Sequence, residues 1–204
     1  MENSQVWDVA VFVDPQCPFA WITTQWLLEV ARHTGIRVRI ELMSLAYVNE
    51  GRDLDDSYRD YNEQAWRPAR VAAALLASPD IASWSRFYTT FGNRRHVQGV
   101  RDNASNIAQT LRELGLPAAL AGAAEDSGWD QDLRARTRAA VEPSGGHGGT
   151  PMIHTARRAF FGPVLTAIPR GRAAVRMWQA VRTLADSPEF AEIRGARDDD
   201  LHTT

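Results

Sequence analysis

The residue best suited to chemistry is the only cysteine of the chain, Cys17, in the stretch VDPQCPFAW (residues 13–21). A cysteine thiolate is the nucleophile of disulfide exchange and of covalent catalysis, whereas lone cysteines are also common as small buried residues. Cys17 stands where a strand-like run meets a helix-like run, which favours the functional interpretation. The first turn of a helix offers unpaired N–H groups and the positive end of the helix dipole. We therefore expect the pKa of Cys17 to fall from about 8.5 to below neutrality.

The elements around Cys17 are predicted from hydrophobic periodicity. Residues 6–13 are β-branched and aromatic, which is typical of a buried parallel strand. From Pro18 to about His33 apolar residues recur at helical spacing, and Pro18 suits a first helical turn. Residues 36–46 alternate as a second strand. Together these segments predict a βαβ unit with the cysteine at its first strand-to-helix turn.

The rest of the chain reads as helices followed by a hairpin and a closing helix. Residues 53–140 are rich in Ala, Arg and Leu, and we expect several short helices there. The expected interruptions are Pro68, Pro79, Gly92, Gly99, Pro117 and Gly128. A glycine-rich loop at 142–151 precedes a hairpin at 152–162, and residues 170–187 form an amphipathic pattern typical of a surface helix.

This order of elements predicts an α/β fold of the thioredoxin type with a large α-helical insertion. We expect a thioredoxin-like domain from residues 1–52 and 141–195, a helical insertion from 53–140 and a flexible tail from 196–204. Thr150 and Pro151 fall where that fold has a cis-proline, and an X-Pro bond is the only place where a cis peptide is cheap. We expect this pair to present its backbone to a bound thiol.

Composition limits the possible partners and cofactors. The net charge of −2 predicts no nucleic acid and no anionic membrane as partner, which leaves a small molecule. No apolar run approaches the roughly 20 residues of a membrane span, and a single cysteine suits a reducing cytoplasm. The histidines are scattered, so we expect no metal. The oligomeric state stays open between a monomer and a homodimer.

Several segments resemble a known family. DPQCPFAWIT resembles the active-site segment of the DsbA-like branch of the thioredoxin superfamily. Four further segments resemble, in order, the actinobacterial mycothiol-dependent nitroreductase family: MSLAYVNEGRD (43–53), GNRRHVQG (92–99), GTPMIH (149–154) and AFFGPVLTAIPRG (159–171). The resemblance covers nearly the whole chain. It implies an intracellular reductase that uses the small thiol mycothiol and no bound flavin, and that acts on electrophilic small molecules such as nitroaromatics.

The resemblance also implies roles for individual residues. The family's nucleophile falls on Cys17, its cis-proline on Pro151, and its substrate-pocket asparagine and tyrosine on Asn49 and Tyr58. Phe19 stands where the family typically has Trp. The other candidates for binding the thiol or the substrate are Pro18, Trp21, His96 and Thr150.

Three of these candidates have a second interpretation from their sequence context. His96 orients or deprotonates a thiol, or is a surface or capping residue in an Arg-rich segment. Asn49 bonds a substrate carbonyl or nitro group, or shapes a turn ahead of Gly51. Trp21 lines an aromatic pocket, or is core.

One position departs from the family pattern of Cys-Pro-aromatic-Cys, because Ala20 replaces the second cysteine. Without a resolving thiol no internal disulfide forms at the site. Cys17 then either forms a mixed disulfide with mycothiol, which a second mycothiol resolves, or the redox cycle is lost. In the second case the pocket serves isomerisation, group transfer or simple ligand binding, and the sequence leaves both outcomes open.

Overall fold

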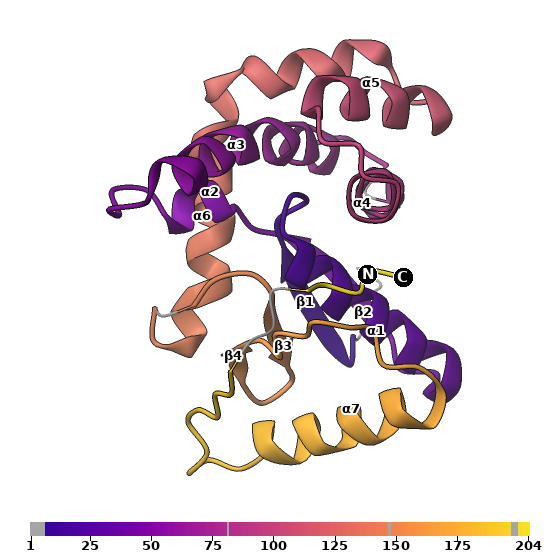
Figure 1. Cartoon of the computed structure of the whole chain (residues 1–204), viewed down its shortest axis with the longest axis vertical. Coiled ribbons are helices and arrows are strands. Elements are labelled where there is room, and N and C mark those ends of the chain that lie inside the picture. Colours follow the sequence, from indigo (N-terminus) through magenta and orange to yellow (C-terminus); the bar gives the residue numbers. More distant parts are fainter. Residues whose placement is uncertain (1–6, 81, 147, 197–199) are drawn as a thin grey trace.

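A computed structural model describes residues 7–80, 82–146, 148–196 and 200–204, and its centre is a mixed four-stranded sheet (Figure 1). The strands are β1 (Val9–Val13), β2 (Val38–Leu42), β3 (Met152–Thr155) and β4 (Ala159–Phe161), in the order β2-β1-β3-β4. β1 pairs parallel with β2 and antiparallel with β3, and β3 pairs antiparallel with β4. This topology confirms the α/β fold expected from the sequence.

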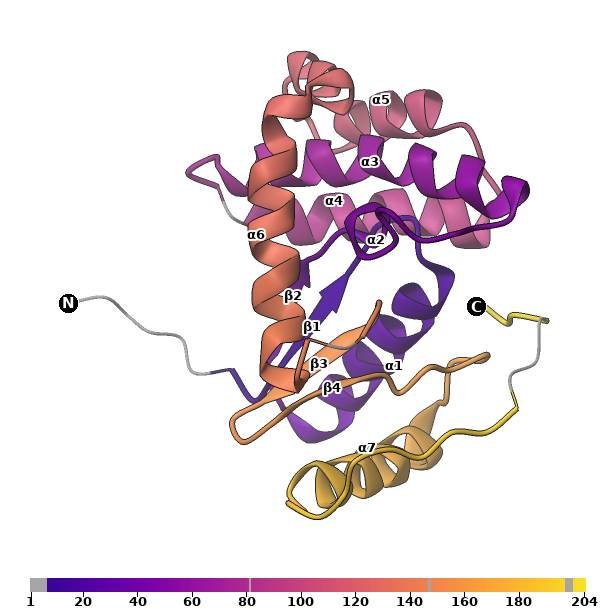
Figure 2. The same ribbon diagram turned by 90° about the vertical axis from the view of Figure 1, so that its left-hand side faces the viewer.

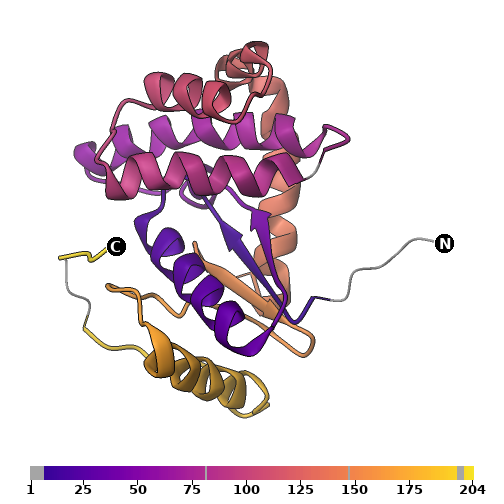
Figure 3. The same ribbon diagram turned by 90° about the vertical axis from the view of Figure 1, so that its right-hand side faces the viewer.

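Helices cover both faces of the sheet. α1 (Pro18–Thr34) and α7 (Gly171–Ala185) lie on one face, and α6 (Asp130–Val141) crosses the other (Figures 2 and 3). Trp26 joins the first two helices: it is fully buried, and its indole N–H donates to the Ala174 carbonyl at 3.1 Å. Among the described residues no helix is long and apolar enough to cross a bilayer.

A layer of helices lies beyond the ends of β1 and β2 (Figure 1). It contains α3 (Asp56–Leu76), α4 (Ala82–Gly92) and α5 (Asn103–Glu113). Buried aromatic side chains of α4, namely Trp84, Phe87, Tyr88 and Phe91, fill its centre. The shorter elements are α2 (Leu45–Val48), η1 (Asn93–Val97), η2 (Ala118–Glu125), η3 (Ser127–Trp129) and η4 (Glu142–Ser144).

Helix α3 continues through Pro68, where the sequence predicts a break. A proline inside a helix lacks the N–H that would bond the carbonyl four residues earlier, which is that of Gln64. The Asn103 side chain takes this place, because its Nδ2 donates to the Gln64 carbonyl at 2.9 Å. A contact from α5 therefore offsets the missing helical bond, and the expectation of short helices was wrong for α3.

Other predicted boundaries shift by a few residues. The first strand begins at Val9, and residue 6 of the predicted strand lies outside the described residues. The second strand ends at Leu42, because the Ser44 side chain accepts the Tyr47 N–H and thereby starts α2. The predicted breakers Pro79, Gly99 and Pro117 do fall between elements.

Residues 201–204 lie against the domain, contrary to the tail expected from composition. The Thr203 hydroxyl donates to the His96 carbonyl at 2.6 Å, and the Thr203 carbonyl accepts the Trp21 indole N–H at 3.1 Å. The His202 N–H donates to the Thr166 carbonyl at 2.8 Å. These bonds place the segment beside α1 and η1 (Figure 1).

Candidate active site

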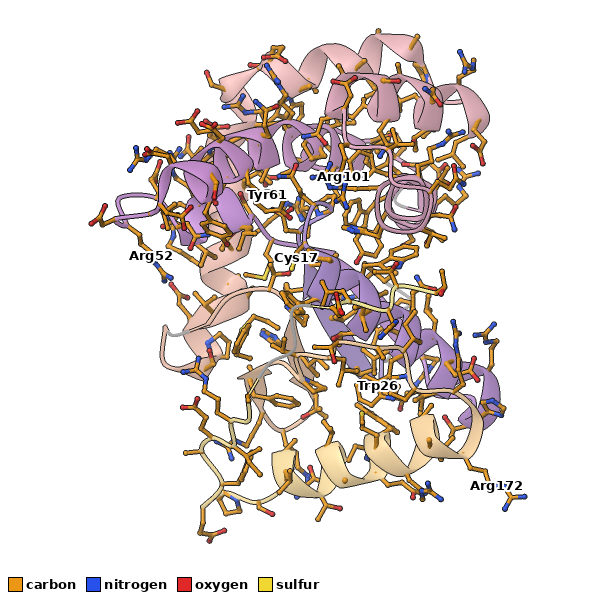
Figure 4. The ribbon with its side chains drawn as sticks, viewed as in Figure 1. Cys17, Trp26, Arg52, Tyr61, Arg101 and Arg172 are labelled. Atoms are coloured by element: carbon orange, nitrogen blue, oxygen red, sulfur yellow. The ribbon has the colours of Figure 1, made fainter. Side chains whose placement is uncertain are left out.

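Cys17 lies at the junction of β1 and α1, as the sequence predicts (Figure 4). It is the N-cap residue of α1, with Pro18 in the first turn, and its Sγ accepts the Ala20 N–H at 3.4 Å. This donor is one of the N–H groups that a helix start leaves unpaired. The sulfur is thus held at a point where one backbone dipole favours negative charge.

The loop at Thr150 and Pro151 meets Cys17 from the other end of the chain. The Thr150–Pro151 peptide bond is cis. The Cys17 Sγ donates to the Thr150 carbonyl at 3.5 Å, and the Thr150 hydroxyl accepts the Asp14 N–H at 3.1 Å. The predicted site residue Thr150 therefore contacts both the nucleophile and the loop that carries it.

Burial controls the protonation of Cys17. Only 4% of the residue is exposed. Removal from water raises the pKa of the Cys17 thiol to about 12, the Asp14 carboxylate adds to the rise, and the Ala20 N–H opposes it. A buried thiolate loses hydration that the backbone N–H groups at the helix start do not replace. The sequence prediction of a pKa below neutrality is therefore wrong for this structure, in which Cys17 is a neutral thiol.

Asp14, the residue after β1, is a fully buried carboxyl that the sequence did not single out. Burial raises its pKa to about 6, against the hydrogen bonds that stabilise its charge. One oxygen accepts the Gln16 N–H and the other accepts the Leu45 N–H, both at 2.7 Å. Asp14 therefore joins the Cys17 loop to the start of α2.

His96 and Trp21 form a pair beside the loop. Their rings stack with centroids 5.8 Å apart and an interplanar angle of 27°. Burial lowers the pKa of His96 to about 3, so the ring is neutral and its Nε2–H donates to the Pro15 carbonyl at 3.2 Å. This hydrogen bond ties His96 to the loop that carries Cys17. A Cβ on Gly92 would lie 2.5 Å from the Trp21 ring, so this approach requires glycine.

Asn49 and Tyr58, which the resemblance assigns to the substrate pocket, are in contact with each other. The Asn49 side-chain amide donates to the Tyr58 hydroxyl at 3.3 Å and to the Asn62 side-chain oxygen at 3.1 Å. The Tyr58 ring stacks on Tyr61 with centroids 5.8 Å apart. Burial raises the pKa of both tyrosines, and the negative charge of an ionised Cys17 adds to the rise. Phe19 is partly buried and packs against the core.

Three buried polar residues join this site without having been singled out from the sequence. They are Gln16, Arg95 and Asn103. Asn103 Nδ2 donates to Gln16 Oε1 at 2.9 Å, and Arg95 Nη1 donates to Asn103 Oδ1 at 3.1 Å. These partners lie far apart along the chain, so no local pattern indicates them. In the described part of the chain no group of three or more metal-ligating side chains is found.

Comparisons with known proteins agree with this geometry. Residues 16–195 match the family model described as Rv2466c-like, mycothiol-dependent nitroreductase Rv2466c. The chain is 30% identical over 183 residues to the Mycobacterium tuberculosis protein Rv2286c, covering 89% of this chain and 78% of that protein.

Two solved structures are similar in fold. One is 2-hydroxychromene-2-carboxylate isomerase in its selenomethionine form, with a TM-score of 0.59, 16% identity and coverage of 86% of this chain and 93% of that one. The other is the cytosolic disulfide reductase DsbM from Pseudomonas aeruginosa with GSH, with a TM-score of 0.54, 15% identity and coverage of 86% and 98%. At these identities the likeness establishes the DsbA-like thioredoxin fold.

Proposed function

Because the chain belongs to the Rv2466c-like family of mycothiol-dependent nitroreductases, we propose that it is a thiol-dependent reductase of small electrophilic molecules. Cys17 is its nucleophile, mycothiol is its reductant, and neither a metal nor a flavin takes part. The observation that carries this proposal is the position of Cys17, capping α1 and bonded to the Thr150 carbonyl.

The proposed cycle uses one protein thiol. An electrophilic acceptor takes two electrons and two protons, one proton from Cys17 and one from mycothiol, and the two sulfurs join in a mixed disulfide. A second mycothiol then attacks the mycothiol sulfur of that bond. Its thiol proton passes to the Cys17 sulfur, mycothiol disulfide leaves, and the protein returns to its thiol form. Ala20 has no thiol to offer, so the resolving thiol must come from solution.

The site supports each step with groups already described. The Ala20 N–H stabilises charge on the Cys17 sulfur while the bond forms. The Thr150 carbonyl accepts a hydrogen bond from the Cys17 thiol in the resting state. Tyr58 and Asn49, whose side chains are hydrogen-bonded to each other, would contact an acceptor. We place the reaction in the cytoplasm, with a small molecule as partner and no nucleic acid or membrane.

Intact-mass analysis tests the proposal. Incubation with mycothiol disulfide is expected to add one mycothiol to the protein, reversibly on adding free mycothiol, and Cys17 is the only cysteine that can carry it. The Cys17→Ser protein should gain no adduct and should not reduce a nitroaromatic with mycothiol, while its circular dichroism matches the parent. Reduction that persists in Cys17→Ser would contradict the proposal.

The absence of a second cysteine, together with the raised pKa of Cys17, favours one alternative, a non-redox isomerase, transferase or binding protein. A neutral buried thiol suits addition to a bound ligand without consumption of reductant. The Ala20→Cys variant separates the two cases, because residues three apart at a helix start are close enough for a disulfide. If only this variant reduces disulfides and the parent forms no mycothiol adduct, the alternative holds.

A further inference from the structure

A polar pocket of about 400 Å³ opens beside the Cys17 loop. Its walls come from α3, from η1, from the turn before α5 and from Gln16, the residue that precedes the nucleophile. Figure 4 shows two of its residues, Tyr61 and Arg101, on the helical side of Cys17. The volume lies within the range of pockets that take small ligands.

The inner wall of this pocket is buried and hydrogen-bonded. Gln16 is 1% exposed; its Nε2 donates to the Tyr61 carbonyl at 2.6 Å, and its own carbonyl accepts the Tyr61 hydroxyl at 2.6 Å. Arg95 is 4% exposed, and its Nη1 bonds the Arg101 carbonyl and Asn103. The Arg95 Nε is buried without a hydrogen-bond partner among the described residues. An unpaired buried donor is costly, and the Arg95 guanidinium thus keeps hydrogen-bonding capacity that the described residues do not use.

The outer rim carries balanced charge. Arg101 and Asp60 are exposed, and in the described part of the chain neither side chain makes a hydrogen bond or an ion pair. Asp102 also lines the pocket, where it caps α5 by accepting the Ser105 N–H. Together with Arg95 these residues place two positive and two negative groups around one opening.

Such a lining selects a ligand class. An anion would meet the Asp60 and Asp102 carboxylates, and a cation would meet the two guanidinium groups. An apolar ring would desolvate all four charges and pair none of them. A neutral molecule rich in hydroxyl groups satisfies both kinds of charge, since each hydroxyl donates to a carboxylate and accepts from a guanidinium. The pocket therefore suits a neutral polyol.

We propose that this pocket binds the glucosaminyl-inositol part of mycothiol and thereby directs its sulfur to Cys17. The inference rests on the proposed use of mycothiol. In mycothiol about five covalent bonds of roughly 1.5 Å separate the sulfur from the sugar ring. Gln16 both lines the pocket and is joined to Cys17 by one peptide bond. The sugar part of mycothiol would therefore lie in the pocket while its thiol lies next to Cys17.

The first experiment measures binding without chemistry. Reduced mycothiol is titrated into Cys17→Ser protein by calorimetry, beside the same protein with Arg101→Ala or Asp60→Ala. Both pocket residues are exposed, so the variants are expected to fold. Each substitution should weaken binding about tenfold, the loss expected for a hydrogen bond to a charged group. The matched controls Arg112→Ala and Asp53→Ala, exposed residues that do not line the pocket, should leave binding unchanged.

The second experiment compares thiols on the protein with Cys17 intact. The mixed disulfide should form faster with mycothiol disulfide than with the disulfides of glutathione or N-acetylcysteine, and Arg101→Ala should slow only the mycothiol reaction. Equal rates for all three, with no effect of Arg101→Ala or Asp60→Ala on binding, would overturn the pocket while leaving the reductase proposal intact. Pocket-dependent binding with no nitroaromatic reduction would support the pocket and contradict the reductase proposal.

Discussion

The alkylation rate of Cys17 shows whether burial or the position at the helix start has the larger effect on the pKa of the thiol. Burial raises the pKa of the thiol to about 12, whereas the position at the start of α1 alone predicts a value below neutrality. The rate of alkylation by iodoacetamide depends on the thiolate fraction. Burial therefore predicts a rate below that of an unperturbed cysteine, and the helix start predicts a rate above it. The unfolded protein supplies that unperturbed cysteine, because Cys17 is the only thiol in the chain.

The expected rate follows from the thiolate fraction and its nucleophilicity. At pH 7 a pKa of about 12 leaves a thiolate fraction of about 10⁻⁵, against about 3% for a free cysteine with a pKa near 8.5. The fraction therefore falls about 3,000-fold. A thiolate with a higher pKa is intrinsically more reactive. With a Brønsted slope near 0.45, its intrinsic rate constant rises about 40-fold, which partly offsets the smaller thiolate fraction. Native Cys17 should react about a hundredfold more slowly than the unfolded chain.

The assay is intact-mass analysis of samples quenched over time, from pH 6 to pH 10, with and without guanidinium chloride. The native rate should keep rising across this range, because the thiol stays largely protonated, while the unfolded rate levels off above about pH 8.5. A native rate equal to or above the unfolded rate at pH 7, or a native plateau below pH 8, would refute the assignment of burial as the dominant effect.

Three further outcomes follow from the structure. Asp14 has a pKa of about 6 in the folded protein and about 3.9 in the unfolded chain. Between these values the folded state binds more protons, so the free energy of unfolding falls by about 3 kcal/mol as the pH rises through them. Urea unfolding from pH 4 to 7 should show that Asp14→Asn loses this decline, and identical profiles in both proteins would contradict the assignment. Gly92→Ala should lower the melting temperature, because its Cβ would lie 2.5 Å from the Trp21 ring and overpacking costs about 1–3 kcal/mol. Gly122→Ala is the control, since its Cβ meets nothing within 4 Å. A higher melting temperature for Gly92→Ala would show that Trp21 does not pack there. Deleting residues 201–204 leaves the buried Trp21 indole N–H without the Thr203 carbonyl and should lower the free energy of unfolding by about 1–3 kcal/mol in urea; no change would mean that the segment does not lie on the domain in solution.

What could be predicted from the sequence was local. Cys17 at the start of α1 follows from a strand pattern, a proline and a helical pattern that are contiguous in the chain. The pKa of the thiol does not, because residues such as Thr150, more than a hundred positions away, help to exclude water from it. Proline at 68 is a sound local signal for a helix end, and it fails because a side chain from α5 bonds the carbonyl it leaves unpaired.

In the candidate site, too, some residues were indicated by the sequence and others were not. The resemblance assigned Asn49 and Tyr58 to the substrate pocket, and the structure adds that their side chains bond each other. Gln16, Arg95 and Asn103 had no such signal, since each is a common polar residue whose role appears only when three separate segments meet. Thr203 was missed for the opposite reason: a charged and polar composition suggests a solvated tail, while two hydrogen bonds tie it to Trp21 and His96.

The position of residues 201–204 has a practical consequence for handling the protein. Any peptide fused after Thr204 begins next to the Trp21 and His96 pair. A purification tag or fluorescent label there would sit beside the reactive loop, where its histidines or dye would compete with small ligands and perturb the very rates being measured. Reporter groups are better attached at exposed positions of the helical layer, such as Ala119 on η2, which is remote in sequence from the loop and carries no role in the proposed chemistry.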